Sequence, residues 1–241
     1  MDAIKIVGLT KKYKDVIAVD NLSLSVRRGE LFSLLGVNGA GKTTTIKMLS
    51  TLTKPTSGDA FLNGKSICSQ SADVKKIIAV SPQETAMAPG LSVKENLELI
   101  CGVYGFSKKK QNEKIEELSG LLGLETVISK KAGKLSGGYG RRLSIAMALI
   151  SEPEILFLDE PTLGLDVLAR SDLWDIIHSL KEKVTIVLTT HYMEEAEALS
   201  DRIAIMKDGK LLICETAEKI KETAKTDNFE QAFIRIVKGE A

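Results

Sequence analysis

The chain has 241 residues, of which 44% are apolar and 27% charged, and its formal net charge is +1. This composition is typical of a folded globular protein and excludes a disordered chain. The balanced charge gives no electrostatic reason to expect nucleic acid or an anionic membrane surface as a partner. The N-terminal residues lack the apolar core of a signal peptide, and no apolar run is long enough to span a bilayer, so we expect a cytoplasmic chain.

Strand-like segments open the chain and lead into a glycine-rich loop. Apolar residues alternate with polar ones around Ile4 and Ile6, and again over residues 22–26. Residues 30–35 form a third strand-like run, and residues 36–43 then read Gly-Val-Asn-Gly-Ala-Gly-Lys-Thr. This is the G-x-x-x-x-G-K-[ST] phosphate loop, with a strand before it and a helical segment after it.

The phosphate loop predicts a nucleotide site. Gly36, Gly39 and Gly41 lack a Cβ, so main-chain N–H groups can converge on an anion. The helix that begins near Gly41 directs its positive end at the same point. Lys42 would reach the β- and γ-phosphates, and Thr43 would offer its hydroxyl to Mg²⁺. The predicted nucleotide-binding residues of this loop are Gly36, Asn38, Gly39, Ala40, Gly41, Lys42, Thr43 and Thr44.

The middle of the chain is predicted to be helical. Val93, Leu97 and Ile100 recur at helical spacing, and a second such pattern covers residues 115–122. We therefore predict that residues 86–150 form a helical lobe inserted into an α/β core, which comprises residues 1–85 and 151–215.

Two carboxylates follow the next buried strand. Residues 155–158 are a continuous apolar run, as expected for a strand buried on both faces of a parallel sheet, and Asp159 and Glu160 come directly after it. Downstream of a phosphate loop, carboxylates at this place are the expected partners in Mg-nucleotide chemistry. Asp159 would hold hydrated Mg²⁺, and Glu160 would polarise the water that attacks the γ-phosphate.

The last third returns to strands. Residues 184–188 predict another buried strand, residues 203–213 predict a hairpin with an Asp-Gly turn, and residues 216–241 predict a helical tail. Cys68, Cys101 and Cys214 show no C-x-x-C spacing, so we expect buried or partly buried thiols rather than disulfides or a zinc site.

A further motif points to a family. Leu135-Ser136-Gly137-Gly138 lies between the phosphate loop and the Asp159-Glu160 strand, and this order resembles the ABC-type ATPases over nearly the whole chain. The resemblance implies an α/β P-loop NTPase core with a parallel sheet, an N-terminal antiparallel β subdomain and the inserted helical lobe. It also implies that two chains sandwich ATP, with Ser136, Gly137 and Gly138 facing the γ-phosphate bound by the opposite subunit.

The same resemblance implies further site residues. Tyr13 corresponds to the aromatic residue that stacks on adenine, Gln83 to the glutamine that reaches the metal or the attacking water, and His191 to the histidine that contacts the γ-phosphate. Tyr139 departs from the family pattern, which usually has Gln at this position.

The resemblance implies the ATP-binding and ATP-hydrolysing subunit of a transporter, with ATP and Mg²⁺ as cofactors. Its expected partners are separate transmembrane permease subunits and a second ATPase chain, identical or related, and no nucleic acid. Residues 190–197 look like the drug- and polymer-exporter branch, so we expect export and a location on the cytoplasmic face of the membrane. One alternative is an ABC ATPase that acts on nucleic acid or ribosomes. Another, a small-molecule kinase, leaves residues 135–138 and His191 unexplained.

Overall fold

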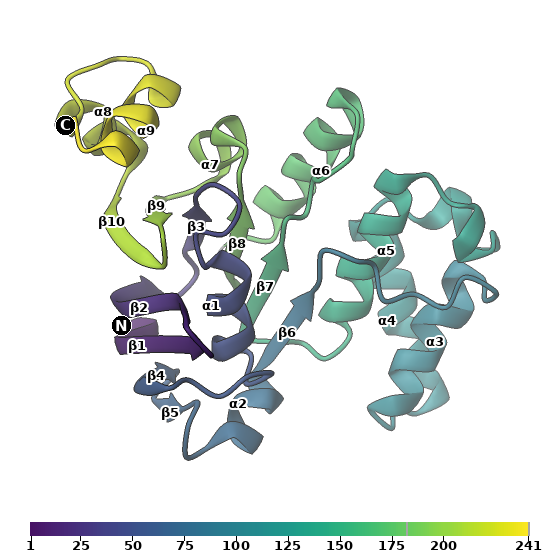
Figure 1. Cartoon of the computed structure of the whole chain (residues 1–241). Helices are drawn as coiled ribbons and strands as arrows, with labels where there is room; N and C mark the ends of the chain where they lie inside the picture. Colours follow the sequence, from purple (N-terminus) through teal and green to yellow (C-terminus); the bar gives the residue numbers. More distant parts are fainter. Residues whose placement is uncertain (182, 241) are drawn as a thin grey trace.

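Three apolar runs form the centre of the larger sheet. They are the strands β3 (Leu31–Leu35), β7 (Ile155–Asp159) and β8 (Thr185–Thr190), and every residue in them is buried. Strands covered on both faces need such continuous apolar sequence. The computed structural model, which describes residues 1–181 and 183–240, shows helices on both sides of this sheet (Figure 1).

The larger sheet has six strands in the order β10, β9, β3, β8, β7, β6. The outer members are β6 (Ile78–Ser81), β9 (Arg202–Lys207) and β10 (Lys210–Glu215). Neighbours pair in parallel, except that β10 is antiparallel to β9. The predicted parallel core is therefore confirmed. The carboxyl ends of β3, β7 and β8 meet at one edge, which is where open α/β sheets bind ligands.

Side chains of the central strands alternate between two apolar clusters. Phe32 and Phe157 pack with the N-terminal strands and the helix α1 (Lys42–Leu49), whereas Leu158 and Ile186 pack with the helices on the other face. Successive strand residues point to opposite faces, so each strand contributes to both clusters. Both faces of these strands are buried, so a shift of one residue would send each side chain to the wrong cluster. The register of the strands that carry the site is therefore fixed.

The N-terminal segments form a second, antiparallel sheet in the order β2 (Val16–Arg27), β1 (Asp2–Tyr13), β4 (Ser57–Leu62) and β5 (Lys65–Ser66). Ile4 pairs with Val26 on one side and with Leu62 on the other, and all three are buried. The predicted antiparallel subdomain is confirmed. It lies beside α1 and the start of β6 (Figure 1).

Three helices lie together in the middle of the chain, α3 (Val93–Val103), α4 (Lys108–Leu121) and α5 (Gly137–Leu149). Ser92 and Glu95 form a capping box that begins α3, and the Ser107 side chain accepts a hydrogen bond from Lys110 N to begin α4. Figure 1 shows this group on the side of the molecule remote from α8 (Ala217–Thr223) and α9 (Phe229–Lys238). The domain boundaries given above remain a prediction.

The hairpin of β9 and β10 touches the phosphate loop. Asp208 and Gly209 both have positive φ, 48° and 78°, as the tight hairpin turn requires. Gly209 N donates to Ala40 O at 3.2 Å, and Asp20 N donates to Gly209 O at 2.9 Å. The turn therefore supports the loop from one side.

The remaining α-helices are α2 (Ser71–Ile77), α6 (Val167–Ser179) and α7 (Met193–Leu199), and two short 3-10 helices cover Glu125–Val127 and Ala132–Lys134. The sequence patterns above did not predict α2, α7 or the two-residue strand β5. The prediction for Cys68 was wrong, because this thiol is exposed, whereas Cys101 is buried and Cys214 partly buried. Within residues 1–181 and 183–240, none of the helices combines the length and the apolar character that crossing a membrane requires.

Candidate active site

The phosphate loop forms one wall of a cavity of about 770 Å³ at the carboxyl edge of the sheet. Residues 38–44 line it, residues 16–18 of β2 face them, and Gln83, Glu160 and His191 come from other loops. Gly41 has φ 100°, and an added Cβ there would lie 2.4 Å from Ala18 O. Glycine is therefore required at this position by both backbone angle and space.

Lys42 lies at the base of this cavity with 5% of its surface exposed. Its ammonium donates to Gly36 O at 2.7 Å and to Val37 O at 3.3 Å, and lies 3.6 Å from Glu160 Oε1. Burial lowers the pKa of Lys42, and the carboxylates of Glu160 and Asp159 oppose that shift. The cavity thus holds a cation in low-dielectric surroundings, where it would bind a phosphate strongly.

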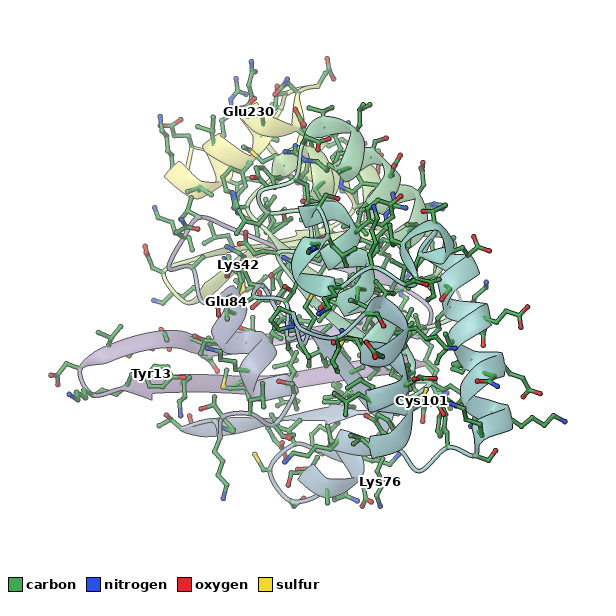
Figure 2. All side chains as sticks on the ribbon, turned by 90° about the vertical axis from the view of Figure 1, so that its right-hand side faces the viewer. Tyr13, Lys42, Lys76, Glu84, Cys101 and Glu230 are labelled. Atoms are coloured by element: carbon green, nitrogen blue, oxygen red, sulfur yellow. The ribbon has the colours of Figure 1, made fainter. Side chains whose placement is uncertain are left out.

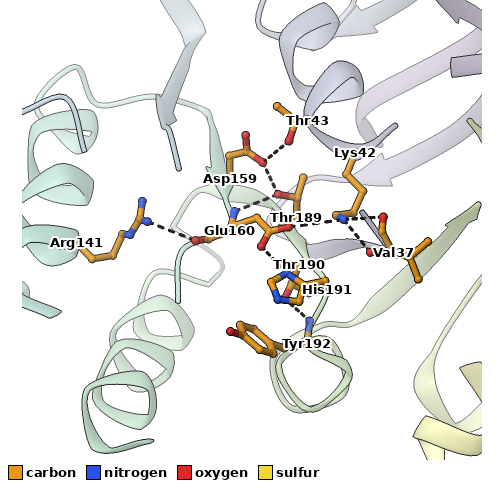
Figure 3. Close-up of polar contacts among 11 residues, drawn as sticks. Val37, Lys42, Thr43, Arg141, Asp159, Glu160, Thr189, Thr190, His191 and Tyr192 are labelled. Atoms are coloured by element: carbon orange, nitrogen blue, oxygen red, sulfur yellow. Dashed lines mark hydrogen bonds and ion pairs between the residues drawn. The ribbon is translucent and has the colours of Figure 1, made fainter. Parts of the chain in front are cut away.

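Asp159 ends β7 and faces the first turn of α1. Thr43 Oγ1 donates to Asp159 Oδ1 at 3.1 Å, and Thr189 Oγ1 donates to the same oxygen at 2.5 Å (Figure 3). Asp159 as a whole is 6% exposed. A hydroxyl and a carboxylate so placed, with Gln83 on the same cavity, are the hard oxygen donors that Mg²⁺ prefers beside a nucleotide.

Glu160 adopts positive φ, 49°, directly after the strand, a rare conformation for a residue with a side chain. Its N–H donates to both Thr189 O and Thr189 Oγ1 at 3.1 Å, which holds the backbone in place. Its carboxylate then points into the cavity, and Oε2 lies 2.5 Å from His191 Nδ1 (Figure 3). Strained backbone of this kind concentrates at functional sites.

A family model described as ABC transporter matches residues 19–163. The chain belongs to the ABC transporter family. The probable multidrug ABC transporter ATP-binding protein YbhF of Escherichia coli strain K12 is 42% identical over 235 residues, which cover 95% of this chain and 40% of that protein. The doxorubicin resistance ATP-binding protein DrrA of Mycobacterium tuberculosis strain CDC 1551 / Oshkosh is 40% identical over 225 residues, which cover 92% of this chain and 68% of that protein. This chain thus spans well under half the length of YbhF.

A solved structure is similar over most of the fold. It is a dimeric post-hydrolysis state of the ATP-binding cassette MJ0796 bound to ADP and Pi, with 29% identity and a TM-score of 0.79, covering 88% of this chain and 98% of that chain. The recognition of an ABC ATP-binding subunit, the ABC ATPase fold and the ATPase activity are confirmed by these similarities.

Residues 135–138, the signature loop of this ABC ATPase, lie apart from the cavity. Ser136 and Gly137 are exposed and Gly138 is partly buried at the start of α5, and Ser136 makes no side-chain cap bond. An added Cβ on Gly138 would lie 3.2 Å from Ala169 Cβ, so the loop rests against α6 of its own chain. Its outer surface stays accessible to another molecule.

Tyr13 is not among the residues that line the cavity. It is 45% exposed, and Lys11 Nζ lies 4.9 Å from the centre of its ring. Figure 2 shows Tyr13 on the projecting strand pair, away from Lys42. Its adenine-stacking role in this ABC ATPase therefore remains a prediction.

Arg141 is a residue of the site that sequence reasoning missed. It is 5% exposed on α5 and donates to Pro82 O at 2.6 Å, to Gln83 O at 2.8 Å and to Glu160 O at 3.4 Å. Burial lowers the pKa of its guanidinium, and Asp159 and Glu195 oppose that shift. Helix α5 is thus tied to the backbone of the two loops that carry Gln83 and Glu160. The position of Arg141, close after residues 135–138 in the sequence, was the feature that could have pointed to its role.

Proposed function

We propose that this ABC ATPase powers export of a substrate through membrane-spanning permease subunits that are separate chains. The observation that carries the proposal is the convergence of Lys42, Glu160 and His191 on one cavity at the phosphate loop, with Asp159 bonded to Thr43 of its wall. The names of DrrA, a doxorubicin resistance protein, and YbhF, a probable multidrug transporter protein, support export as the direction. The chain would then sit on the cytoplasmic face of the membrane, held there by its permease.

Thr43, Asp159 and Gln83 would hold Mg²⁺ with the β- and γ-phosphates. The ion would neutralise charge that develops on the transferred phosphoryl group. Thr189 supports this arrangement, because its hydroxyl orients the Asp159 carboxylate that the ion would face. Outer hydrogen bonds of this kind fix the direction of a ligand oxygen.

Glu160 would accept a proton from the attacking water, and His191 would contact the γ-phosphate. Their direct contact places both groups on the same side of the cavity as Lys42. Phosphoryl transfer needs positioning and charge neutralisation more than covalent help. Lys42 at the start of α1, Glu160 directly after β7 and His191 directly after β8 together meet that need.

The second ATPase chain would supply the signature loop to this cavity. Ser136, Gly137 and Gly138 begin a helix of 13 residues, whose free N–H groups attract an anion. They do not line the cavity of their own chain but are open to a partner. The dimeric state of the MJ0796 structure supports such a pairing. ATP binding would close the dimer and thereby move the permease, and hydrolysis would reopen it.

Affinity purification of the chain from the membranes of its host tests the transport role. A multi-span membrane protein that co-purifies in a fixed ratio, and that stimulates ATP hydrolysis when reconstituted in vesicles, is the expected result. Purification with RNA, DNA or ribosomal subunits, and no membrane protein, would contradict the proposal.

A further inference from the structure

His191 lies between two cavities. Its side chain lines the cavity at the phosphate loop and also a second cavity of about 390 Å³, whose walls come from α6, α7 and the start of α9. Main-chain contacts fix the place of His191 but not the direction of its imidazole, which turns about two side-chain bonds. A contact that keeps the imidazole out of the second cavity would therefore decide whether it can act on a nucleotide.

The ring of Tyr192 supplies such a contact. The centres of the His191 and Tyr192 rings are 4.2 Å apart, with 38° between their planes. Figure 3 shows the imidazole between the Glu160 carboxylate and the Tyr192 ring. His191 Nδ1 thus meets Glu160 on one side, and the aromatic ring covers another side. Packed rings of this kind favour one relative orientation.

The ring contact depends on a turn of the backbone, because His191 and Tyr192 are neighbours in the chain. Consecutive side chains of an extended chain point to opposite sides. Tyr192 N donates to Thr190 Oγ1 at 2.9 Å, and Thr190 is buried, so the chain turns directly after β8. Bonds from a side-chain hydroxyl to the nearby backbone stabilise such turns. This turn brings the two rings together.

Arg170 provides a second contact to the Tyr192 ring. It lies in α6, and its guanidinium carbon is 4.6 Å from the centre of the ring, within the range of a cation–π contact. Among the described residues, Arg170 Nε has no hydrogen-bond partner. Its ion pair with the exposed Glu194 carboxylate is long, at 4.0 Å, and such pairs contribute little. The ring therefore holds Arg170, and Arg170 in turn limits the movement of the ring.

We propose that Tyr192 is a positioning residue: its ring, supported by Arg170, holds the His191 imidazole against Glu160. This inference rests on the proposed role of His191 in hydrolysis. Tyr192 lines the second cavity and not the first, so it would act on the reaction through His191 and not on the nucleotide. Without the ring, the second cavity would give the imidazole room to turn away from Glu160.

The variants Tyr192→Leu and Tyr192→Phe test the ring itself. Leu fills part of the space but presents no aromatic face, so we expect kcat to fall by about 10- to 100-fold, the cost of misplacing a reacting group. Phe keeps the ring and should hold kcat within about twofold of wild type. The KM for ATP should change less than kcat, because Lys42 and the phosphate loop are untouched. An equal loss of kcat in both variants would overturn the role of the ring.

A double-variant cycle tests whether Tyr192 acts through His191. We expect Tyr192→Leu to lower kcat in the wild-type background but to add almost nothing to His191→Ala, since the group that it positions is already gone. Tyr104→Leu is the matched control. It alters another exposed tyrosine, at the end of α3 in the helical lobe, and should have wild-type kcat.

Proton NMR of the imidazole provides a readout that does not depend on turnover. The chain has two histidines, and His178 is exposed on α6, so His178→Gln leaves the signal of His191 alone. An aromatic ring shifts the resonances of protons that are packed on it. We expect the His191 Cε1–H resonance to move in Tyr192→Leu and to keep its wild-type position in Tyr192→Phe and in Tyr104→Leu. A resonance that does not move in Tyr192→Leu would overturn the contact.

The outcomes separate this inference from the function that it rests on. If His191→Ala hydrolyses ATP as fast as wild type, the role of His191 fails, and the inference fails with it. If His191→Ala is slow but Tyr192→Leu has wild-type kcat, or lowers kcat equally in both backgrounds, only the positioning role of Tyr192 is overturned. A Tyr192→Leu chain that does not fold leaves the decision to Arg170→Gln, which keeps the ring but removes the cation beside it and should lower kcat only where His191 is present.

Discussion

His191 and Glu160 are in direct contact across the floor of the cavity, with 2.5 Å between His191 Nδ1 and Glu160 Oε2. The other oxygen of this carboxylate lies 3.6 Å from the Lys42 ammonium. One carboxylate therefore bridges the phosphate-loop lysine and the histidine that follows β8. A triphosphate entering the cavity would compete with Glu160 for Lys42, and Glu160 would then be free to accept a proton from water.

Glu160→Gln should bind ATP normally and hydrolyse it about 10²- to 10⁴-fold more slowly, the usual cost of losing a general base. The amide keeps the shape of the side chain but cannot accept the proton. Steady-state phosphate release measures the effect. Glu154→Gln, an exposed carboxylate that accepts from Asn63 Nδ2 at 2.6 Å, should be fully active. Comparable turnover in the two variants would show that Glu160 is not the general base.

Lys42→Ala should weaken ATP binding by about 10- to 100-fold, because it removes a buried cation that faces the phosphates. Titration with a fluorescent ATP analogue measures the dissociation constant. Lys47→Ala, an exposed position on the same helix α1, is the control and should bind as wild type. Equal affinity in both variants would contradict the phosphate-loop assignment.

Arg141→Ala should lower the free energy of unfolding several times more than Arg142→Ala does. Three main-chain carbonyls lose their donor in Arg141→Ala, and the one in buried surroundings, Glu160 O, would cost about 1–3 kcal/mol if left unsatisfied, with smaller losses at the partly buried Pro82 O and Gln83 O. Arg142 pairs with the exposed Asp172 carboxylate at 2.9 Å, a contact worth about 0–1 kcal/mol. Urea unfolding of both variants gives the two values, and equal losses would show that the Arg141 contacts do not stabilise the loops.

Glu195 should make stability depend on pH. Burial raises its pKa in the folded protein above the unfolded value of about 4.3, so the folded state binds more protons between these two pKa values. Its contribution to the free energy of unfolding is complete below the unfolded pKa and is lost as pH rises through the folded pKa. Because Glu195→Gln cannot ionise, the difference between its unfolding free energy and that of wild type should change as the pH rises from the unfolded pKa through the raised pKa of the folded state. A constant difference would contradict the raised pKa.

Local sequence patterns predicted the parts of the site that depend on short segments. The phosphate loop and the Asp159-Glu160 pair each follow a buried strand, and one strand with its loop is enough to define them. Arg141, Thr189 and Glu195 could not be predicted this way. Their roles arise from contacts with residues 19 to 59 positions away, which exist only after the strands have paired.

Local sequence patterns likewise could not predict the features of the fold that depend on long-range contacts. Burial on both faces predicted a parallel sheet, but the order β10, β9, β3, β8, β7, β6 depends on long-range pairing that composition does not encode. The two-residue strand β5 and the seven-residue helices α2 and α7 are too short for a periodic pattern to stand out. Cys68 was predicted to be buried or partly buried because cysteines usually are. It is exposed because it lies on an exposed connection between elements.

The central claim is that two copies of this chain clamp ATP between the phosphate loop of one and residues 136–138 of the other. Light scattering coupled to gel filtration tests it most directly, with Glu160→Gln in the presence of ATP and Mg²⁺. The account predicts a dimer that reverts to monomer when ATP is omitted, or when Gly137→Arg is added while ATP binding persists. A Glu160→Gln chain that binds ATP and stays monomeric at every concentration, or a dimer that tolerates Gly137→Arg, would contradict it.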